Sequence, residues 1–192
     1  MPPCGGRDVG FTDSGDSAER DGQVSLQPGD VGWANQSGFV PWWIKWCQAR
    51  KYHHSPASQF NHVYMVTSWQ GGLIQANGSG MGAGNVSDYA GQNVVYRRPP
   101  YVAPGRNVAV QAMGELLRNH DHYGWWTIFS VALTLLTGTR FRFGVANCLI
   151  CSGAVSYALT RANIDVGDDS DWNSPADLAE YAIAGNWPVI PC

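Results

Sequence analysis

The sequence predicts an α+β fold in which a small antiparallel sheet packs against helices. Segments rich in aromatic and β-branched residues occupy the first half of the chain, and segments with helical periodicity follow from Arg106 onward. The 192 residues, of which 44% are hydrophobic, are enough for one buried core. We therefore expect a single domain over residues 25–192. It is preceded by an arm, residues 1–24, which is rich in Gly, Asp and Ser and is expected to be flexible.

Four strands are expected in the first half of the chain. In "QPGDVGWAN", the Pro-Gly turn leads into a short strand. The segment Phe60–Thr67 is rich in aromatic and β-branched residues and forms a second strand. After the turn at Gly71 and Gly72, the chain returns as a third strand over Leu73–Ala76. The fourth strand lies in "NVVYRRP" and is stopped by the prolines that end this segment.

Two helices are expected from the spacing of apolar residues. In "VPWWIKWCQARK", a helix starts at the proline, and its apolar residues fall on nearly one face: Trp42, Trp43, Trp46 and Ala49. A second helix follows from Arg106. Its apolar face contains Ala109, Met113, Leu116 and Leu117.

Three more helices are expected towards the C-terminus, over residues 125–137, over residues 152–163 and in "SPADLAEYAIAG". The last of these has the residues that favour both ends of a helix. Ser174 is the expected N-cap, Pro175 occupies the first helical position, and Gly185 follows the end.

Charge and hydropathy exclude several classes of protein. A formal net charge of −3 provides no basic field for nucleic acid. The longest apolar run, Trp125–Leu136, is too short to span a bilayer. The first residues contain no apolar stretch typical of a secretory signal, so the protein is expected to be cytoplasmic when synthesised. The five cysteines cannot all pair internally, and we expect reduced thiols: Cys4, Cys47, Cys148, Cys151 and Cys192.

The segment "NCLICSGAVSYAL" contains two cysteines, Cys148 and Cys151, before a run of small and apolar residues. A cysteine at a helix N-terminus can have a pKa lowered from ~8.5 into the ~3.5–7.5 range, which favours the nucleophilic thiolate. The free N–H groups of the same turn can bind an oxyanion. The alternatives are a buried packing cysteine and a zinc site with two histidines. A thioredoxin-like pair is disfavoured because no βαβ pattern precedes it.

A thiolate nucleophile needs an imidazole partner. Of the five histidines, the pairs His53/His54 and His120/His122 occur in polar contexts, whereas His62 enters an apolar strand. Gln75 lies 75 − 62 = 13 positions later on the next strand, and its amide could orient the imidazole. A two-residue hairpin would offset the two side chains by about six positions, or roughly 20 Å. The pair therefore requires a wider loop around Ser68–Gln70.

These segments together resemble the papain-like NlpC-type cysteine hydrolases, in particular their circularly permuted YiiX-like branch. The similar segments occur in the order "QPGDVGW", "NHVYMV", "LIQA", "SDYAGQNVVYRRP", "LICSGAVSYAL" and "NSPADLAEY". They cover roughly residues 27–183. The resemblance implies that Cys151 is the nucleophile, His62 the general base and then acid, and Gln75 the residue that orients the imidazole. It implies no cofactor and no metal.

The resemblance implies a cysteine hydrolase that cleaves amide bonds, most often in peptidoglycan stem peptides. Without a signal peptide, such an enzyme could reach the cell wall through phage lysis or a phage tail. Two alternatives stay open. One is a structural virion or tail component, with the arm of residues 1–24 contacting other virion proteins. The other is a hydrolase or acyltransferase that acts on lipid acyl esters.

Overall fold

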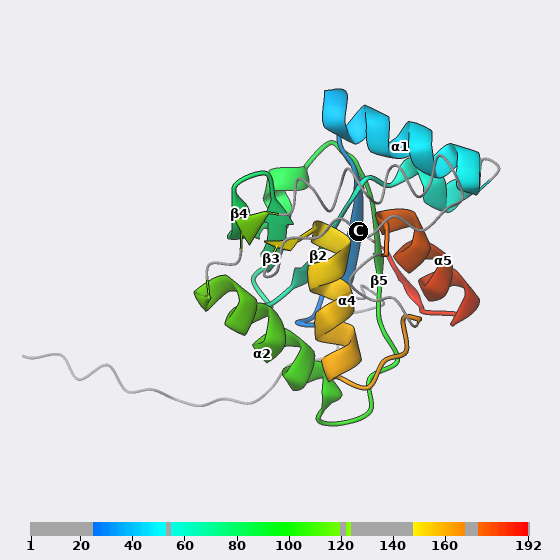
Figure 1. Cartoon of the computed structure of the whole chain (residues 1–192). Coiled ribbons are helices and arrows are strands. Elements are labelled where there is room, and N and C mark those ends of the chain that lie inside the picture. The colour runs from blue at the N-terminus through cyan, green and yellow to red at the C-terminus, as the bar shows by residue number, and fades with distance from the viewer. Residues whose placement is uncertain (1–24, 53–54, 120–121, 124–147, 168–172, 192) are drawn as a thin grey trace, which may run out of the picture.

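The computed structural model describes residues 25–52, 55–119, 122–123, 148–167 and 173–191. These residues form an α+β fold on one six-stranded sheet (Figure 1). The strand order is β4-β3-β2-β1-β5-β8, and every neighbouring pair is antiparallel. The strands are β1 (Val31–Asn35), β2 (His62–Val66), β3 (Gly72–Asn77), β4 (Gly80–Asn85), β5 (Asn93–Arg97) and β8 (Val189–Ile190). The predicted class, an antiparallel sheet packed against helices, is confirmed.

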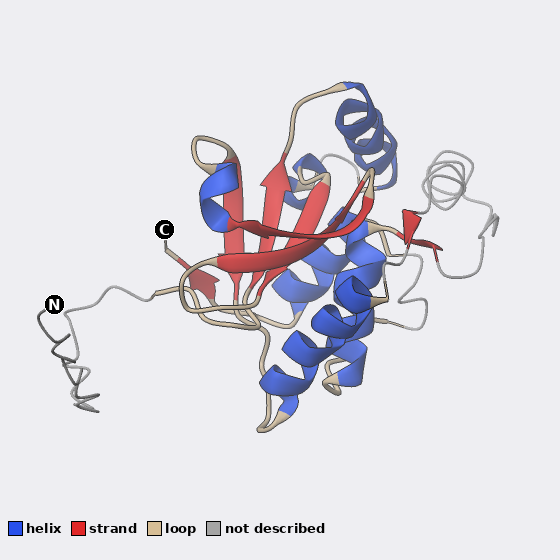
Figure 2. Ribbon diagram, turned by 90° about the vertical axis from the view of Figure 1, so that its left-hand side faces the viewer, coloured by secondary structure: helices blue, strands red, loops and turns tan. Residues whose placement is uncertain are grey.

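Four α-helices are described: α1 (Phe39–Lys51), α2 (Gly105–Arg118), α4 (Cys151–Arg161) and α5 (Pro175–Ala184). Figure 2 shows the helices gathered on one side of the sheet. Of two short 3-10 helices, η1 (Pro56–Gln59) lies between α1 and β2, and η2 (Val86–Tyr89) lies between β4 and β5. Two-residue strands β6 (His122–Tyr123) and β7 (Cys148–Leu149) pair in parallel outside the main sheet. None of the helices in these ranges is both long and apolar enough to cross a membrane.

Alternation along β2 divides the buried side chains between the two faces of the sheet. Val63 and Met65 belong to the larger core, which includes apolar side chains of α2, α4 and α5. Tyr64 and Val66 belong to a smaller core on the opposite face, together with Tyr89 from η2. Successive side chains of a strand point to opposite faces, so β2 is buried on both sides. This central position holds the strand that begins with His62.

Several predicted elements are confirmed with small shifts of their ends. Strand β3 contains Leu73–Ala76, and β5 ends before the two prolines. Helix α4 begins at Cys151 rather than one residue later. In α5, Ser174 is the N-cap, Pro175 the first helical residue and Gly185 the C-cap, as predicted. The predicted helix over residues 125–137 and the arm of residues 1–24 lie outside the described residues.

The predicted helix is present as α1, and it starts two residues earlier than expected. The helix begins at Phe39, so Pro41 lies within its first turn, where a missing N–H costs no intrahelical hydrogen bond. The buried face contains Cys47 and Gln48, whereas Trp42 and Trp46 are 56% and 41% exposed. On this buried face, the amide of Gln48 bonds to the Ser58 and Phe60 carbonyls and to the Ala176 N–H of α5.

Strand β4 was not predicted. Its sequence, GMGAGN, alternates glycine with other residues and contains no β-branched residue. It forms because β3 offers an open edge, and it pairs with β3 along six residues, from Gly72↔Asn85 to Asn77↔Gly80.

Candidate active site

Cys151 is the first residue of α4, where Ile150 is the N-cap. It is 5% exposed and belongs to the larger core. The small residues that follow, Ser152 and Gly153, are also buried, so the start of the helix packs closely against its surroundings. The hydroxyl of Ser152 donates a hydrogen bond to the backbone carbonyl of Asn173, which joins this turn to the segment before α5.

Three backbone N–H groups lie against the thiol of Cys151. Burial raises the pKa of the thiol, whereas hydrogen bonds from the N–H groups of Val63, Ser152 and Cys151 itself lower it. The raised pKa corrects the expectation that the helix start would favour the thiolate in the resting protein. Desolvation of the charged form outweighs the N–H dipoles because the sulfur is enclosed. The resting group is therefore a thiol with donors already arranged for negative charge.

His62 begins β2 beside the end of β1, where its Cα is opposite that of Ala34. The buried amide of Asn61 fixes this end of the strand. Its Oδ1 accepts from the N–H of Gln36 and its Nδ2 donates to the Gln36 carbonyl, both at 2.9 Å. The imidazole is 5% exposed. Burial lowers the pKa of His62 to about 4, although the hydrogen bond to Gln75 acts in the opposite direction.

Gln75 meets His62 because the loop between β2 and β3 is wide. The register Met65↔Ile74 puts Gln75 opposite Tyr64, which is two positions from His62 rather than six. Hydrogen bonds from the N–H groups of Thr67 and Ser68 to the Gly72 carbonyl, 2.7 and 3.2 Å, close the loop. The wider loop around Ser68–Gln70 that the pair requires is thus present. The two side chains share a face, and His62 Nε2 lies 2.6 Å from Gln75 Oε1.

This contact determines the tautomer of the imidazole. An amide oxygen can only accept, so Nε2 carries the proton and donates to Gln75 Oε1. The second ring nitrogen, Nδ1, then has a free lone pair. A neutral imidazole with Nδ1 as the base suits removal of a thiol proton.

The aromatic ring of Tyr89 supports this arrangement from η2. It is nearly parallel to the imidazole of His62, with ring centroids 6.0 Å apart and an interplanar angle of 13°. Its hydroxyl donates to Gln75 Oε1, the same oxygen that accepts from His62. Sequence analysis assigned no role to Tyr89. The available signal was a lone aromatic residue after "NVSD", where Asn85 and Asp88 form a capping box.

Cys151 lies on the α4 side of β2, whereas strand alternation puts the His62 side chain on the other side, against Tyr64 and Tyr89. The thiol of Cys151 lies against the Val63 N–H, and Val63 directly follows His62. In the described structure, no hydrogen bond joins the imidazole to the sulfur. Burial raises the pKa of the thiol and lowers that of the imidazole, so both groups are uncharged in the resting protein. The described residues therefore show no preformed thiolate–imidazolium ion pair.

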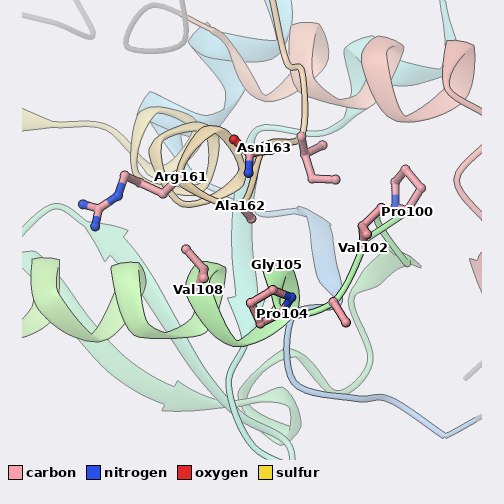
Figure 3. Close-up of a pocket in the computed structure, with 10 residues that line it drawn as sticks. Pro100, Val102, Pro104, Gly105, Val108, Arg161, Ala162 and Asn163 are labelled. Carbon is pink, nitrogen blue, oxygen red and sulfur yellow. The ribbon is translucent and has the colours of Figure 1, made fainter.

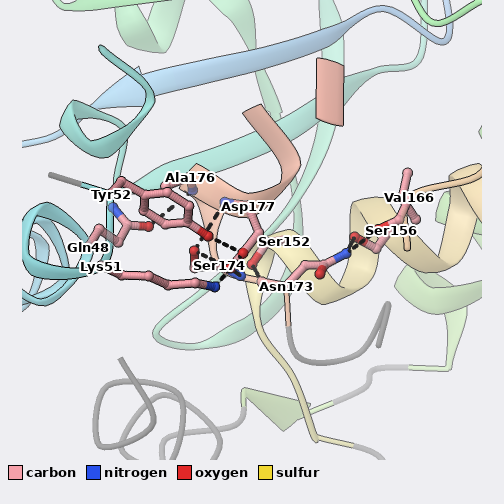
Figure 4. Close-up of polar contacts among 10 residues, drawn as sticks. All are labelled: Gln48, Lys51, Tyr52, Ser152, Ser156, Val166, Asn173, Ser174, Ala176 and Asp177. Carbon is pink, nitrogen blue, oxygen red and sulfur yellow. Dashed lines mark hydrogen bonds and ion pairs between the residues drawn. The ribbon is translucent and has the colours of Figure 1, made fainter. Parts of the chain in front are cut away.

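A buried polar network holds the helix ends around Cys151 (Figure 4). Asn173, whose carbonyl accepts from Ser152, also donates through Nδ2 to the Val166 carbonyl at 2.9 Å and to Ser156 Oγ at 3.3 Å. Farther along, Asp177 of α5 accepts hydrogen bonds from Lys51, the last residue of α1, and from its C-cap Tyr52. The network links the start of α4 to α5 and then to α1.

Most side chains of the zinc alternative, which used Cys148, Cys151 and two histidines, lie outside the described residues. No three His, Cys, Asp or Glu side chains in them lie close enough together to hold a metal ion. Of the cysteines, Cys47 and Cys151 are described, and both are free and buried. The side chains of Cys148 and His122 lie outside the described part of the chain. So do Cys4, Cys192, His53, His54 and His120.

A cavity of about 230 Å³ lies at the far end of α4, where it is lined by Pro104, Val108, Arg161 and Asn163 among others (Figure 3). Helix α4 has 11 residues, so this cavity is about 15 Å from Cys151 along the helix. It is separate from the candidate active site.

A second cavity, of about 360 Å³, lies beside η2. Tyr89, Tyr96, Val86, Val94 and Leu26 are among the residues that line it. Tyr89 therefore borders both this apolar cavity and the imidazole of His62.

No protein-family model matches the chain, and no curated protein matches it significantly. The site is therefore interpreted from its own geometry.

Proposed function

We propose that this protein is a cysteine hydrolase that cleaves an amide bond by acyl transfer through a thioester. In this proposal the fold is the circularly permuted papain-like fold of the NlpC type. Cys151 is the nucleophile, His62 the general base and then acid, and Gln75 orients the imidazole. The proposal includes no cofactor and no metal.

One observation carries the proposal. The thiol of Cys151 lies at a helix N-terminus against the N–H of Val63, and the adjacent His62 donates through Nε2 to Gln75 Oε1 at 2.6 Å. Two of the residues selected from the sequence, on β2 and β3, are thus hydrogen-bonded to each other, and the third lies at the start of α4 beside the residue that follows His62. The imidazole of His62 is buried on β2, two strands from the sheet edge, where a polar group needs a hydrogen-bond partner. Gln75 is that partner.

The reaction follows from these atoms. Nδ1 of His62 takes the thiol proton as the sulfur forms a bond to the substrate carbonyl carbon. The oxygen becomes an oxyanion, which N–H groups of the first turn of α4 can bind once the sulfur is bonded to the substrate carbon. The imidazolium then gives its proton to the leaving amine as the C–N bond breaks, and a thioester remains. Water, deprotonated by the same imidazole, attacks the thioester and releases a carboxylic acid and the thiol.

The substrate class follows from the resemblance described above. We propose amide bonds in peptidoglycan stem peptides, commonly next to D-glutamate, cleaved by a phage-encoded enzyme that acts in lysis or at the tail. The test is incubation of the protein with purified stem peptides and detection of the products by mass spectrometry. Cys151→Ala and His62→Ala should abolish cleavage. Cys47→Ala changes the other described buried thiol and should retain it.

Mass spectrometry also tests the mechanism. A Cys151 peptide that gains the mass of the acyl group in a quenched reaction supports the thioester. If no cleavage and no acylation occur with stem peptides or other amides, the hydrolase proposal is wrong. The structural tail or virion component, which retains the fold without activity, is then the better interpretation.

The apolar cavity beside η2 favours a second candidate, a hydrolase or acyltransferase that acts on lipid acyl esters. The cavity of about 360 Å³ is lined by apolar side chains and shares Tyr89 with the site. An acyl chain in it would lie on the same sheet face as His62. Esters of short and long acyl chains distinguish the candidates. This function predicts Cys151-dependent hydrolysis that improves with chain length, without cleavage of stem peptides.

A further inference from the structure

The amide of Gln75 is an ambiguous partner for an imidazole. It can present either its oxygen or its NH₂ group to His62 Nε2, because the two ends have nearly the same shape. The oxygen stabilises the tautomer with a proton on Nε2 and leaves Nδ1 free as a base. The NH₂ group stabilises the opposite tautomer, in which Nδ1 carries a proton and cannot accept one from the thiol. The orientation of the amide therefore decides whether His62 can act.

Tyr89 contacts the oxygen end of the Gln75 amide and favours the orientation in which this oxygen faces His62. Its hydroxyl donates to Gln75 Oε1, which also accepts from His62 Nε2. Two donors thus converge on one atom, and that atom must be an acceptor. Tyr89 is 5% exposed and its ring stacks on the imidazole, so the hydroxyl has little freedom to move away.

Asp88 lies at the other end of the amide. A Cβ on Gly84 would be 3.4 Å from Gln75 Nε2 and 2.9 Å from Asp88 Oδ2, so both groups flank the same small space. The carboxylate is held there by the N–H of Asn85, at 2.8 Å, as part of the cap of η2. A carboxylate favours the NH₂ end of an amide over its oxygen. It is solvent-exposed, so its effect is weaker than that of the Tyr89 hydroxyl.

We propose that Tyr89 is a positioning residue that, with Asp88, fixes the Gln75 amide with its oxygen towards His62 and so determines the histidine tautomer. One short helix, η2, carries both residues. The consequence for catalysis rests on the proposed function, but the tautomer itself does not. A neutral amide can then orient the imidazole as reliably as a charged group, because its two ends have different neighbours.

The tautomer can be measured directly by NMR. In the full-length protein labelled with ¹⁵N-histidine, a protonated ring nitrogen and one with a free lone pair have different ¹⁵N shifts. The signal of His62 is assigned by its loss in His62→Gln. We expect Nε2 to be protonated in the wild type at neutral pH. Tyr89→Phe keeps the stacked ring but removes the hydroxyl, and should give a mixture of both tautomers.

Tyr96→Phe is the matched control. It removes a buried hydroxyl from the same aromatic cluster, where Tyr96 bonds to the hydroxyl of Tyr64. It should leave the His62 tautomer unchanged. Asp88→Asn keeps an oxygen for the cap but removes the charge, and should shift the tautomer in the same direction as Tyr89→Phe, by less. A wild type with Nδ1 protonated, or a Tyr89→Phe spectrum equal to that of the wild type, would overturn the proposal.

Hydrolysis separates this proposal from the proposed function. With a cleaved substrate, Tyr89→Phe should lower kcat about tenfold, the value of one neutral hydrogen bond, and leave KM unchanged. If no substrate is cleaved but the tautomer shifts as expected, the hydrolase proposal fails and the positioning role stands. If cleavage depends on Cys151 but the tautomer does not respond to Tyr89→Phe, the positioning role fails and the hydrolase proposal stands.

Discussion

Burial shifts the pKa values of Cys151 and His62 in opposite directions. Burial disfavours the charged form of each, so it raises the pKa of the thiol and lowers that of the imidazole to about 4. Both shifts favour the neutral pair. The N–H groups around the sulfur would stabilise a thiolate, but only once charge forms there. The resting site is therefore unreactive by desolvation and arranged for charge by its backbone.

The low pKa of His62 predicts that the protein loses stability in mild acid. The unfolded chain takes up a proton on this residue below about pH 6.5, whereas the folded chain does so only near pH 4. Stability from the neutral imidazole is therefore present above pH 6.5 and is lost as the pH falls towards 4. We expect His62 to contribute a decrease of about 2 kcal/mol in the free energy of unfolding between pH 7 and pH 4.5. Urea unfolding at both pH values measures it.

His62→Gln supplies the reference for this measurement, because glutamine is polar but does not titrate. Its free energy of unfolding should change less between the two pH values than that of the wild type. Subtracting the change in His62→Gln from the change in the wild type removes the contribution of the carboxyl groups, which titrate in both proteins, and leaves that of His62. Equal changes in both proteins would mean that His62 is accessible to protons in the folded state.

At the scale of the element, the start of α5 is determined by residues of the helix itself and its N-cap. Ser174 Oγ accepts from the Asp177 N–H at 3.2 Å, and Asp177 Oδ2 accepts from the Ser174 N–H at 2.9 Å. This capping box satisfies two backbone donors. The segment between Asn173 and Pro175 thus holds the carbonyl to which Ser152 binds.

Loss of this cap should destabilise the protein. Ser174→Ala removes the acceptor for the Asp177 N–H, and we expect the free energy of unfolding to fall by about 1 kcal/mol. Urea unfolding at pH 7 provides the measurement. Ser87→Ala changes an exposed serine at a helix start whose side chain makes no described hydrogen bond, and should alter stability by less than about 0.5 kcal/mol. Equal effects of the two substitutions would show that the cap contributes nothing.

The elements also show what sequence could and could not predict. Helix α5 and strand β5 were predicted because local residues determine them, Ser174 and Gly185 at the helix ends and prolines after the strand. Strand β4 was missed because its glycines carry no strand propensity, and pairing with β3 decides its conformation. The shared face of the α1 tryptophans did not indicate which side is buried, because the inner side contains Cys47 and the polar Gln48.

The residues of the candidate site were selected from local sequence, but the contacts between them depend on the fold. Residue types and chain order indicated Cys151, His62 and Gln75, and the register of β2 with β3 allows the last two to meet. Two features could not be predicted. The enclosure of the thiol depends on tertiary packing, and Tyr89 reaches Gln75 only because η2 returns over the sheet face. Both depend on contacts between segments that are distant in the sequence.

At the scale of the whole molecule, Gln48 joins three elements around the site. From α1 it donates to the carbonyls of Phe60 and Ser58 at 2.8 and 3.3 Å, and accepts from the Ala176 N–H at 3.1 Å. Phe60 lies two residues before His62, and Ala176 lies in the first turn of α5 (Figure 4). The side chain is fully buried. It therefore fixes the approach to β2 and the start of α5 relative to each other.

Replacing Gln48 by leucine should destabilise the whole domain. The substitution keeps the volume but leaves buried backbone groups of η1 and α5 without their partner, and each unsatisfied group costs about 1–3 kcal/mol. We expect the free energy of unfolding to fall by about 3 kcal/mol in urea at pH 7. Gln111→Leu, an exposed glutamine on α2, is the control and should be nearly neutral. Because Gln48 acts through the backbone before His62, the NMR signal of the His62 ring should also change in Gln48→Leu. An unchanged ring signal together with full stability would show that α1 is a peripheral addition to the fold.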